Sequence, residues 1–305
     1  MRNPIRVGTR GSHLALAQAE LVVGILKKTT GGIRYEVVPI RTTGDKAREA
    51  GFSTIKDKSV FTKEIEDALL AREIDMAVHS MKDLTTEQPK GLTIGAVPIR
   101  ENPRDVLVSR KKEKLQALPG GARIGTSSSR RIAQLLAARN DLEIVDMHGN
   151  VDTRLSKLER GDYDAIVVAA AGLIRLGLTK HVTEFLSTEI MLPAVGQGAL
   201  AVECRETDPE VQKMLVKVDD RQTRSAVEAE RAFARRLGAN CHTPIAAYAK
   251  TDLQNVTIDG MVAAASGRML VRGRLTGSAN DSEKVGVQLA ESLLKKGAGA
   301  ILETG

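Results

Sequence analysis

Four different functional groups stand close together in residues 79–83, HSMKD, which hold an imidazole, a hydroxyl, an ammonium and a carboxylate. The run directly follows residues 74–78, an apolar stretch that is typical of a buried strand. Open α/β sheets bind ligands beyond the carboxyl ends of their strands. Lys82 beside Asp83 could therefore tune this carboxylate for acid, base or cation-stabilising chemistry. The alternative is a surface turn in which Lys82 and Asp83 are merely neighbours.

Two glycine-containing segments, residues 8–12 (GTRGS) and 125–131 (GTSSSRR), follow one plan. In each, a strand ends, glycine permits a tight turn, and hydroxyls open a helix whose free N–H groups attract anions. The second segment is also basic, because no acidic residue occurs between residues 122 and 139. Arginine binds planar carboxylates and phosphates through two parallel hydrogen bonds. The arginines of this stretch are Arg123, Arg130, Arg131 and Arg139. The alternative is ordinary helix capping by serine, with solvated arginines.

The two cysteines of the sequence are too few for a disulfide framework. Cys241 lies in a predicted loop, residues 237–244 (LGANCHTP), and the preceding helix end is rich in arginine. An exposed thiol near cations is readily ionised and nucleophilic. Cys204 belongs to an apolar strand and is expected to be buried and inert. The arginines before the loop are Arg231, Arg235 and Arg236.

Other familiar chemistry has no support in the sequence. Neither a CxxC nor an HExxH pattern occurs, so no metal site is predicted. A GxxxxGK[ST] phosphate loop is absent. Residues 196–201, GQGALA, match a loose dinucleotide pattern, but a strand is expected after them where that site needs a helix.

The segments that could do chemistry sit at the ends of elements in an alternating β and α pattern. Residues 5–7, 35–40 and 74–78 are expected as strands, with helices over 14–28 and 62–72 between them. Ser12 is the expected N-cap of the first helix. The alternation starts again near residue 104, and such alternation predicts parallel sheets. The further strands are expected at residues 105–108, 123–124, 143–147, 164–169 and 200–204, with helices up to residue 136 and over 153–160.

The last part of the chain has a different pattern. A Pro- and Gly-containing connection over residues 192–200 is interpreted as an interdomain crossover. A helical stretch over 221–237, a strand pair at 256–263 and 269–275, and a helix over 282–296 predict a small α+β domain.

Composition limits the class of protein. The chain has 305 residues, 42% of them apolar, and its cores must use aliphatic side chains because Trp is absent and only four Phe and three Tyr occur. The net charge of +7 permits anionic partners. No apolar run reaches the roughly 18 residues of a membrane span, and no signal peptide is recognised. We expect a cytoplasmic protein.

The longest of these motifs resemble those of the porphobilinogen deaminase family, also called hydroxymethylbilane synthases. The resemblance runs in order along nearly the whole chain. Its residues are 78–84 (VHSMKDL), 125–131, 149–155 (GNVDTRL), 192–198 (LPAVGQG) and the Cys241 loop.

The resemblance implies an α/β fold in three domains. The first two, residues 1–98 with 195–216 and residues 99–194, are expected to be like the halves of periplasmic binding proteins with the active cleft between them. The third, residues 217–305, is expected to be a small α+β domain that presents Cys241. Family enzymes join four porphobilinogen molecules head to tail with loss of ammonia, and they release hydroxymethylbilane for haem and corrinoid synthesis. The chain grows on a dipyrromethane cofactor held by a thioether to a loop cysteine, which by position is Cys241.

The resemblance also implies roles for individual residues. Asp83 is expected to be catalytic, because a carboxylate that faces the pyrrole nitrogens can stabilise a cationic azafulvene and move protons. The implied cofactor-binding residues are Ser80, Lys82, Asp83, Thr126, Ser128, Arg130, Arg131 and Arg154. The implied substrate-binding residues are Arg10, Ser12, Gln18, Lys58, His148, Arg154, Arg175 and Gln197.

Two positions depart from the family pattern. His148 stands where the family usually has an arginine, so that anion contact is expected to depend on pH. Residues 56–59, KDKS, replace a Gly-Gly-Lys-Gly stretch in the loop over the active site, and only Lys58 aligns with its lysine. A stiffer loop is expected.

Two other classes of function compete with the transferase. A non-catalytic, two-lobed binder of small anions would explain the cleft without Cys241. A nucleic-acid-binding regulator is the weaker alternative, because no helix-turn-helix or stacking aromatics accompany the basic residues. We expect porphobilinogen and the growing oligopyrrole as partners, no nucleic acid or membrane partner, and a monomer.

Overall fold

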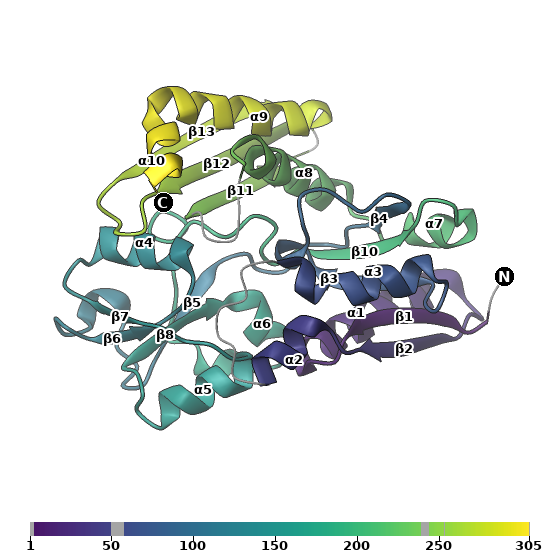
Figure 1. The fold of residues 1–305 in the computed structure, drawn as a ribbon, viewed down its shortest axis with the longest axis horizontal. Helices are drawn as coiled ribbons and strands as arrows, with labels where there is room; N and C mark the ends of the chain where they lie inside the picture. Colours follow the sequence, from purple (N-terminus) through teal and green to yellow (C-terminus); the bar gives the residue numbers. More distant parts are fainter. Residues whose placement is uncertain (1–2, 50–57, 239–243, 253, 305) are drawn as a thin grey trace. The chain divides into compact units, whose positions relative to one another are not determined.

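The computed structural model describes residues 3–49, 58–238, 244–252 and 254–304 (Figure 1). The chain divides into two compact units, one of residues 1–101 with 199–224 and one of residues 102–198 with 225–305. The boundaries of the three expected domains stay a prediction. No helix in the described part of the chain is long and apolar enough to cross a membrane.

The first unit is built on a five-stranded sheet with the strand order β2-β1-β3-β10-β4 (Figure 1). Its strands are β1 (Ile5–Arg10), β2 (Tyr35–Ile40), β3 (Met76–Ser80), β4 (Leu92–Ala96) and β10 (Leu200–Arg205). β1 pairs in parallel with β2 and β3, but β10 is antiparallel to both β3 and β4. The expectation of a purely parallel sheet is therefore wrong. β10 runs against its neighbours because the chain reaches it on its return from residues 102–198, without a βαβ crossover.

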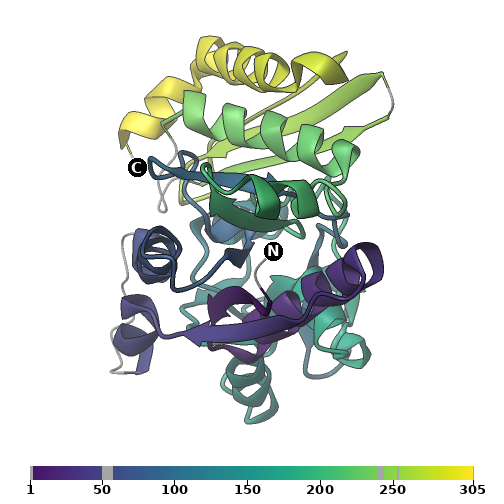
Figure 2. The ribbon, with the colours of Figure 1, turned by 90° about the vertical axis from the view of Figure 1, so that its right-hand side faces the viewer.

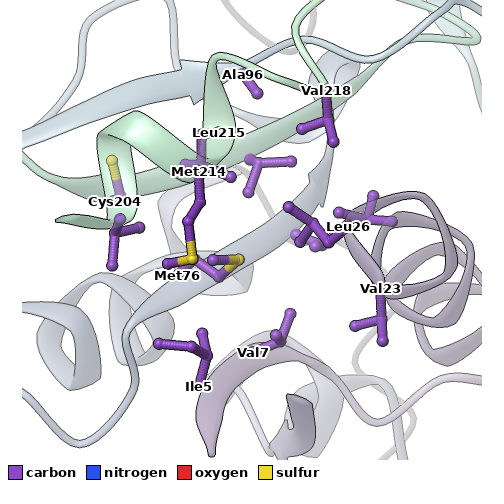
Figure 3. Packing of buried hydrophobic residues seen from close by; sticks show 14 of the residues in the cluster. Ile5, Val7, Val23, Leu26, Met76, Ala96, Cys204, Met214, Leu215 and Val218 are labelled. Carbon is purple, nitrogen blue, oxygen red and sulfur yellow. The ribbon is translucent and has the colours of Figure 1, made fainter. Parts of the chain in front are cut away.

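Helices cover both faces of this sheet. α1 (His13–Thr30) and α7 (Pro209–Leu215) pack on one face with an aliphatic core, and α3 (Lys63–Leu70) packs on the other. Figure 3 shows Met76 and Met214 side by side in the first of these cores, to which Cys204 also belongs. The side chain of Ser12 accepts a hydrogen bond from the backbone N of Ala15, as expected of an N-cap. α2 (Thr43–Glu49) and the 3₁₀ turn η1 (Lys58–Phe61) lie between β2 and α3 in the sequence.

The second unit contains a similar five-stranded sheet with the order β7-β6-β8-β5-β9. Here β5 is the antiparallel strand, between β8 and β9. The strands are β5 (Asp105–Ser109), β6 (Arg123–Gly125), β7 (Glu143–Val145), β8 (Ala165–Ala169) and β9 (Glu184–Phe185). The helices that accompany them are α4 (Ser129–Ala138), α5 (Val151–Glu159) and α6 (Ala170–Arg175), with 3₁₀ turns at Leu115–Ala117 and Thr179–His181.

A three-stranded antiparallel sheet follows in the same unit, where we expected two strands. Its strands are β11 (Ile245–Thr251), β12 (Asn255–Ala263) and β13 (Leu270–Ser278). α8 (Arg221–Arg236) and α9 (Ser282–Leu293) cover one face of this sheet (Figure 2). The two helices approach closely, because a Cβ on Gly286 of α9 would lie 2.1 Å from the carbonyl oxygen of Ala229 on α8. The chain continues through a 3₁₀ turn (Ala279–Asp281) before α9, and a π-turn (Leu294–Ala298) and α10 (Gly299–Thr304) after it. The predicted class, two α/β sheets with a small α+β element at the end, is confirmed.

Candidate functional site

A pocket lies at the carboxyl ends of β1 and β3, where the sequence predicted a ligand site. Its polar walls combine hydrogen-bond donors with a single aspartate. They are Thr9, Arg10, Ser12, Gln18, Thr62, His79, Ser80 and Asp83. Four of the residues implied as substrate-binding or cofactor-binding thus share one pocket with the implied catalytic carboxylate.

Hydrogen bonds fix the turn that carries Asp83. Met81 opens the 3₁₀ turn η2 (Met81–Asp83), and its backbone N donates to the Ala199 carbonyl at 3.1 Å, which ties the turn to β10. Ser80 and Gln18 hydrogen-bond each other, with Gln18 Nε2 2.9 Å from Ser80 Oγ. Lys82 lies half-buried in the same turn. Residues 79–83 are not exposed throughout, because His79 and Met81 are buried and Ser80 and Asp83 line a pocket.

Arg10 is held by two residues that the sequence analysis did not single out. Its guanidinium forms an ion pair with Asp45 on α2, and the ring of Phe61 lies under it at 4.5 Å from Cζ to the ring centroid. Burial alone would raise the pKa of Asp45, but hydrogen bonds from Arg10 and Thr42 bring it below its ordinary value.

A buried cluster of titratable groups lies behind the pocket. His79 Nε2 is 3.2 Å from Glu203 Oε2, and Glu203 is fully buried on β10. Glu66 of α3 belongs to the same cluster, since the charges of Glu203 and His79 both act on its carboxyl group. Burial and the charge of Glu203 raise the pKa of Glu66, although a hydrogen bond with Thr62 and the charge of His79 oppose the shift.

In the second unit, Asp105 binds both arginines of the basic segment. Arg130 Nη1 donates to Asp105 Oδ2 at 2.8 Å, and Arg131 Nε and Nη2 donate to Oδ1 at 3.0 and 2.7 Å. Asp105 is fully buried and both arginines are nearly so. Burial opposes ionisation of Asp105, but the two positive charges lower its pKa to about 2. The interpretation of these arginines as solvated is wrong.

Arg130 and Arg131 differ in how many of their guanidinium nitrogens make hydrogen bonds within the protein. Arg131 Nη1 donates to the Val167 carbonyl at 3.0 Å, so all three of its nitrogens have partners. Arg130 Nη1 also donates to the Leu192 carbonyl, whereas no hydrogen bond of its Nε or Nη2 occurs within the described ranges. Arg130 therefore retains the better edge for an added carboxylate.

The hydroxyl residues 126–128 directly precede α4, but their side chains make no hydrogen bond to its backbone N–H groups. Thr126 Oγ1 accepts from the backbone N of Ser128 at 3.2 Å, and Ser127 Oγ donates to the Met147 carbonyl at 2.6 Å. Ser128 occupies the N-cap position, but its side chain makes no capping hydrogen bond. Plain capping by serine therefore does not account for this hydroxyl.

The remaining implied residues of this unit are spread over α5, α6 and the connection to β10. His148 Nε2 is 2.6 Å from Asp146 Oδ2, and Arg154 Nε donates to the Gly149 carbonyl at 2.8 Å. Arg175 Nη2 donates to the Gly198 carbonyl at 2.7 Å, and Gln197 Nε2 donates to the Pro103 carbonyl at 2.7 Å. His148 thus already has an anionic neighbour within the protein.

The structure describes one of the two cysteines. Cys204 is fully buried, as expected, and burial raises the pKa of its thiol to about 11. A thiol with a raised pKa is a poor nucleophile, and the inertness of Cys204 stays a prediction. Cys241 and residues 56 and 57 lie outside the described residues, as does the side chain of Lys58. Arg235 and Arg236 at the end of α8 pair with Glu283 and Glu291 of α9. The described residues contain no cluster of three or more His, Cys, Asp or Glu side chains that could hold a metal ion.

Comparison with known proteins bears on both units. A family profile described as "Porphobilinogen deaminase, dipyromethane cofactor binding domain" matches residues 5–213, and the profile "Porphobilinogen deaminase, C-terminal domain" matches residues 225–295. The chain belongs to the porphobilinogen deaminase family. Relatives with this name include those of Pelotomaculum thermopropionicum, 50% identical over 99% of this chain and 97% of the relative, and of Desulforudis audaxviator, 50% identical over 99% and 98%. The relative from Geobacillus sp. strain WCH70 is 48% identical over 98% and 96%.

Two solved structures to which the chain is similar match it at low sequence identity. The periplasmic VFT2 domain of Bordetella pertussis BvgS gives a TM-score of 0.43 at 16% identity, over 70% of this chain and 86% of that one. The aliphatic sulphonate binding protein SsuA of Escherichia coli gives 0.42 at 13% identity, over 77% and 70%. Neither similarity carries an argument about this member of the porphobilinogen deaminase family.

Some residues of the site were missed from the sequence. From the sequence, Asp105 is only the start of an apolar strand, although a carboxylate inside such a strand is itself a signal of a buried partner. Asp45, Phe61 and Glu203 gave no local signal for their roles, because Arg10 and His79, which they contact, are distant in sequence. Glu66 gave no signal either.

Proposed function

We propose that this chain is a tetrapyrrole-biosynthetic transferase that joins four porphobilinogen molecules head to tail and releases hydroxymethylbilane. The observation that carries the proposal is the pocket in which one carboxylate, Asp83, stands among the donors Arg10, Ser12 and Ser80. A pyrrole with acetate and propionate groups needs donors for its carboxylates and an anion for the cation formed at its ring. The family membership of the chain supports the same activity.

In each cycle the carbon–nitrogen bond of the aminomethyl group breaks and ammonia leaves with the electron pair. The cationic unit that remains is attacked by the free α-carbon of the growing chain, which then loses its proton. We assign to Asp83 the stabilisation of the cation and the acceptance of that proton. Arg10, Ser12, Gln18, Lys58, His148, Arg154, Arg175 and Gln197 are proposed to bind substrate carboxylates.

The dipyrromethane cofactor is proposed to be attached through Cys241 by a thioether. The family profile over residues 5–213 supports a cofactor of this class. A thiolate attacks carbon far better than a hydroxyl group does. We propose that Ser80, Lys82, Thr126, Ser128, Arg130, Arg131 and Arg154 bind its carboxylates. When bound, the cofactor supplies the free α-carbon on which the chain grows.

Intact mass of the purified protein tests the proposal. The enzyme should carry a covalent dipyrrole and turn over porphobilinogen, and Cys241→Ser should fold but lose both properties. Cys204→Ser is the matched control and should keep both. A parent protein that shows the bare polypeptide mass and binds porphobilinogen without turnover would be a non-catalytic binding protein. A Cys241→Ser variant with the dipyrrole and the parent rate would contradict the attachment site.

A further inference from the structure

The guanidinium of Arg10 is fixed from two directions. Its Nε donates to Asp45 Oδ2 at 3.4 Å and its Nη2 donates to Asp45 Oδ1, so the carboxylate takes the Nε and Nη2 edge. The ring of Phe61 covers a face of the guanidinium at 4.5 Å. An edge contact and a face contact together set both the plane and the rotation of the group.

Asp45 is itself held in place. Its Oδ2 accepts hydrogen bonds from the backbone N and from Oγ1 of Thr42, at 3.4 and 2.8 Å, and Thr42 is fully buried. Thr42 Oγ1 also accepts from the backbone N of Asp45 at 3.2 Å. The carboxylate therefore has a fixed position before it meets Arg10.

Phe61 is fixed by the start of α2. Gly44 is buried against the ring, and a Cβ built at this position would lie 2.2 Å from Phe61 Cε1. Only glycine leaves room for the ring there. One segment, residues 42–45, thus holds both Asp45 and the ring under Arg10.

The contacts leave one side of Arg10 for a ligand. Within the described ranges no hydrogen bond is made by Nη1, and Arg10 lines the pocket with Ser12 and Asp83. Guanidinium groups have five N–H donors, and those on the Nη1 and Nη2 edge can still receive a second carboxylate.

We propose that Asp45 is a positioning residue that acts through Arg10, holding its Nη1 and Nη2 edge toward the substrate carboxylate. This inference rests on the proposed role of Arg10 in binding substrate. The opposite role for the same contact is internal competition, in which a substrate carboxylate must displace Asp45 from Arg10. The two roles change KM in opposite directions.

The test is Asp45→Asn, which keeps the shape of the side chain and removes its charge. We expect KM for porphobilinogen to rise about tenfold with kcat within about threefold of the parent. Asp45→Glu, which restores the charge, should recover part of the loss. In an Arg10→Lys background, Asp45→Asn should have little further effect, because a residue that acts through Arg10 cannot act without it. Asp259→Asn is the control, since it breaks a similar pair with Arg274 on β12 and β13.

A lower KM in Asp45→Asn, or effects of Asp45→Asn and Arg10→Lys that simply add, would overturn the proposal. Rotation of the Arg10 guanidinium, followed by ¹⁵N NMR without substrate, gives a readout that does not depend on turnover. It should speed up in Asp45→Asn, and unchanged rotation would also overturn the proposal. If the parent protein did not turn over porphobilinogen, this result would contradict the proposed function. The NMR measurement of Arg10 rotation would still test the role of Asp45, because it does not need turnover. Thr42→Val removes the two hydrogen bonds that Thr42 Oγ1 makes with Asp45. It replaces Asp45→Asn if circular dichroism shows that the Asp45→Asn variant does not fold.

Discussion

Asp83 is the carboxylate on which the proposed chemistry depends most. Asp83→Asn is nearly isosteric, and η2 is held mainly by backbone hydrogen bonds, so the turn should persist. The amide can neither neutralise a cation nor accept the proton. We expect kcat to fall by a factor on the order of 10² or more, with a smaller change in KM. Steady-state kinetics with porphobilinogen measures both.

A matched control for this variant is Asp67→Asn, because Asp67 is exposed on α3 and lies outside the pocket. It should keep the parent rate. Turnover of Asp83→Asn within about threefold of the parent would make Asp83 a structural residue of the turn.

Asp105 is a buried charge whose loss should cost much stability. Asp105→Asn leaves Arg130 and Arg131 buried side by side without their counter-charge, and breaking such a pair costs about 3–5 kcal/mol of the free energy of unfolding. Urea denaturation at pH 7 measures the difference. Equal stability of the two proteins at pH 7 would contradict the prediction.

The pH dependence of that difference has a definite sign. The pKa of Asp105 is lowered from 3.8 to about 2 in the folded protein, so its stabilising contribution is fully present above pH 3.8. This contribution should fade as the pH falls through about 2. The stability of parent and Asp105→Asn should therefore converge only in this acid range.

At the scale of elements, the turn between β12 and β13 packs on α4 through Gly267. Its φ is +71°, and a Cβ there would lie 2.5 Å from the Ala133 carbonyl oxygen. Gly267→Ala should therefore both strain the backbone and separate the turn from α4. We expect a loss of about 1–3 kcal/mol in the free energy of unfolding, measured by denaturant titration.

Gly177→Ala separates the two causes. Gly177 also has a positive φ, +67°, but nothing lies within 4 Å of its added Cβ. It should lose only the smaller, conformational part, about 1 kcal/mol. If Gly267→Ala and Gly177→Ala lowered the free energy of unfolding equally, the contact between Gly267 and α4 would contribute nothing to stability.

The sequence predicts the long elements well and the short ones poorly. α1 and α9 have a sustained apolar period, and both occur within a few residues of their expected ranges. α2 has seven residues and no apolar stripe of its own, and β11 (IAAYAKT) is dominated by alanine, which favours no strand. Strand direction was also missed, because the apolar period of a strand is the same in parallel and antiparallel sheets.

The site could be located from the sequence but not assembled. Residues 79–83 and 125–131 can be recognised as candidate functional segments from their residue types. The structure places both at strand ends. The partners that hold them are distant, as with Asp105 and Arg130 or Asp45 and Arg10, 25 and 35 positions apart. Only the fold brings such pairs together. The sequence alone therefore does not show that Arg130 and Arg131 are buried against Asp105, and it allowed the wrong interpretation that they are solvated.

At the scale of the whole molecule, the first unit is discontinuous in sequence. β10 lies between β3 and β4, and α7 adds Val211, Met214 and Leu215 to the core of this unit. A fragment of residues 1–101 lacks all of these. We expect it to be unfolded by circular dichroism and amide exchange.

A rearranged chain provides the control for this fragment. Residues 199–224, joined after residue 101 by a flexible Gly/Ser linker, should restore cooperative unfolding, because all strands of the sheet are then present. A cooperatively folded 1–101 fragment would contradict the prediction.

The place of β10 in the sheet also has a consequence for the order in which the chain is made. A ribosome releases β3 and β4 roughly a hundred residues before β10, which at 5–20 residues per second is on the order of 5–20 seconds. During this interval the apolar strand β3 has no partner on one side and is open to pairing with other nascent chains. Fast synthesis, or a chaperone that shields this edge, should therefore raise the yield of native protein.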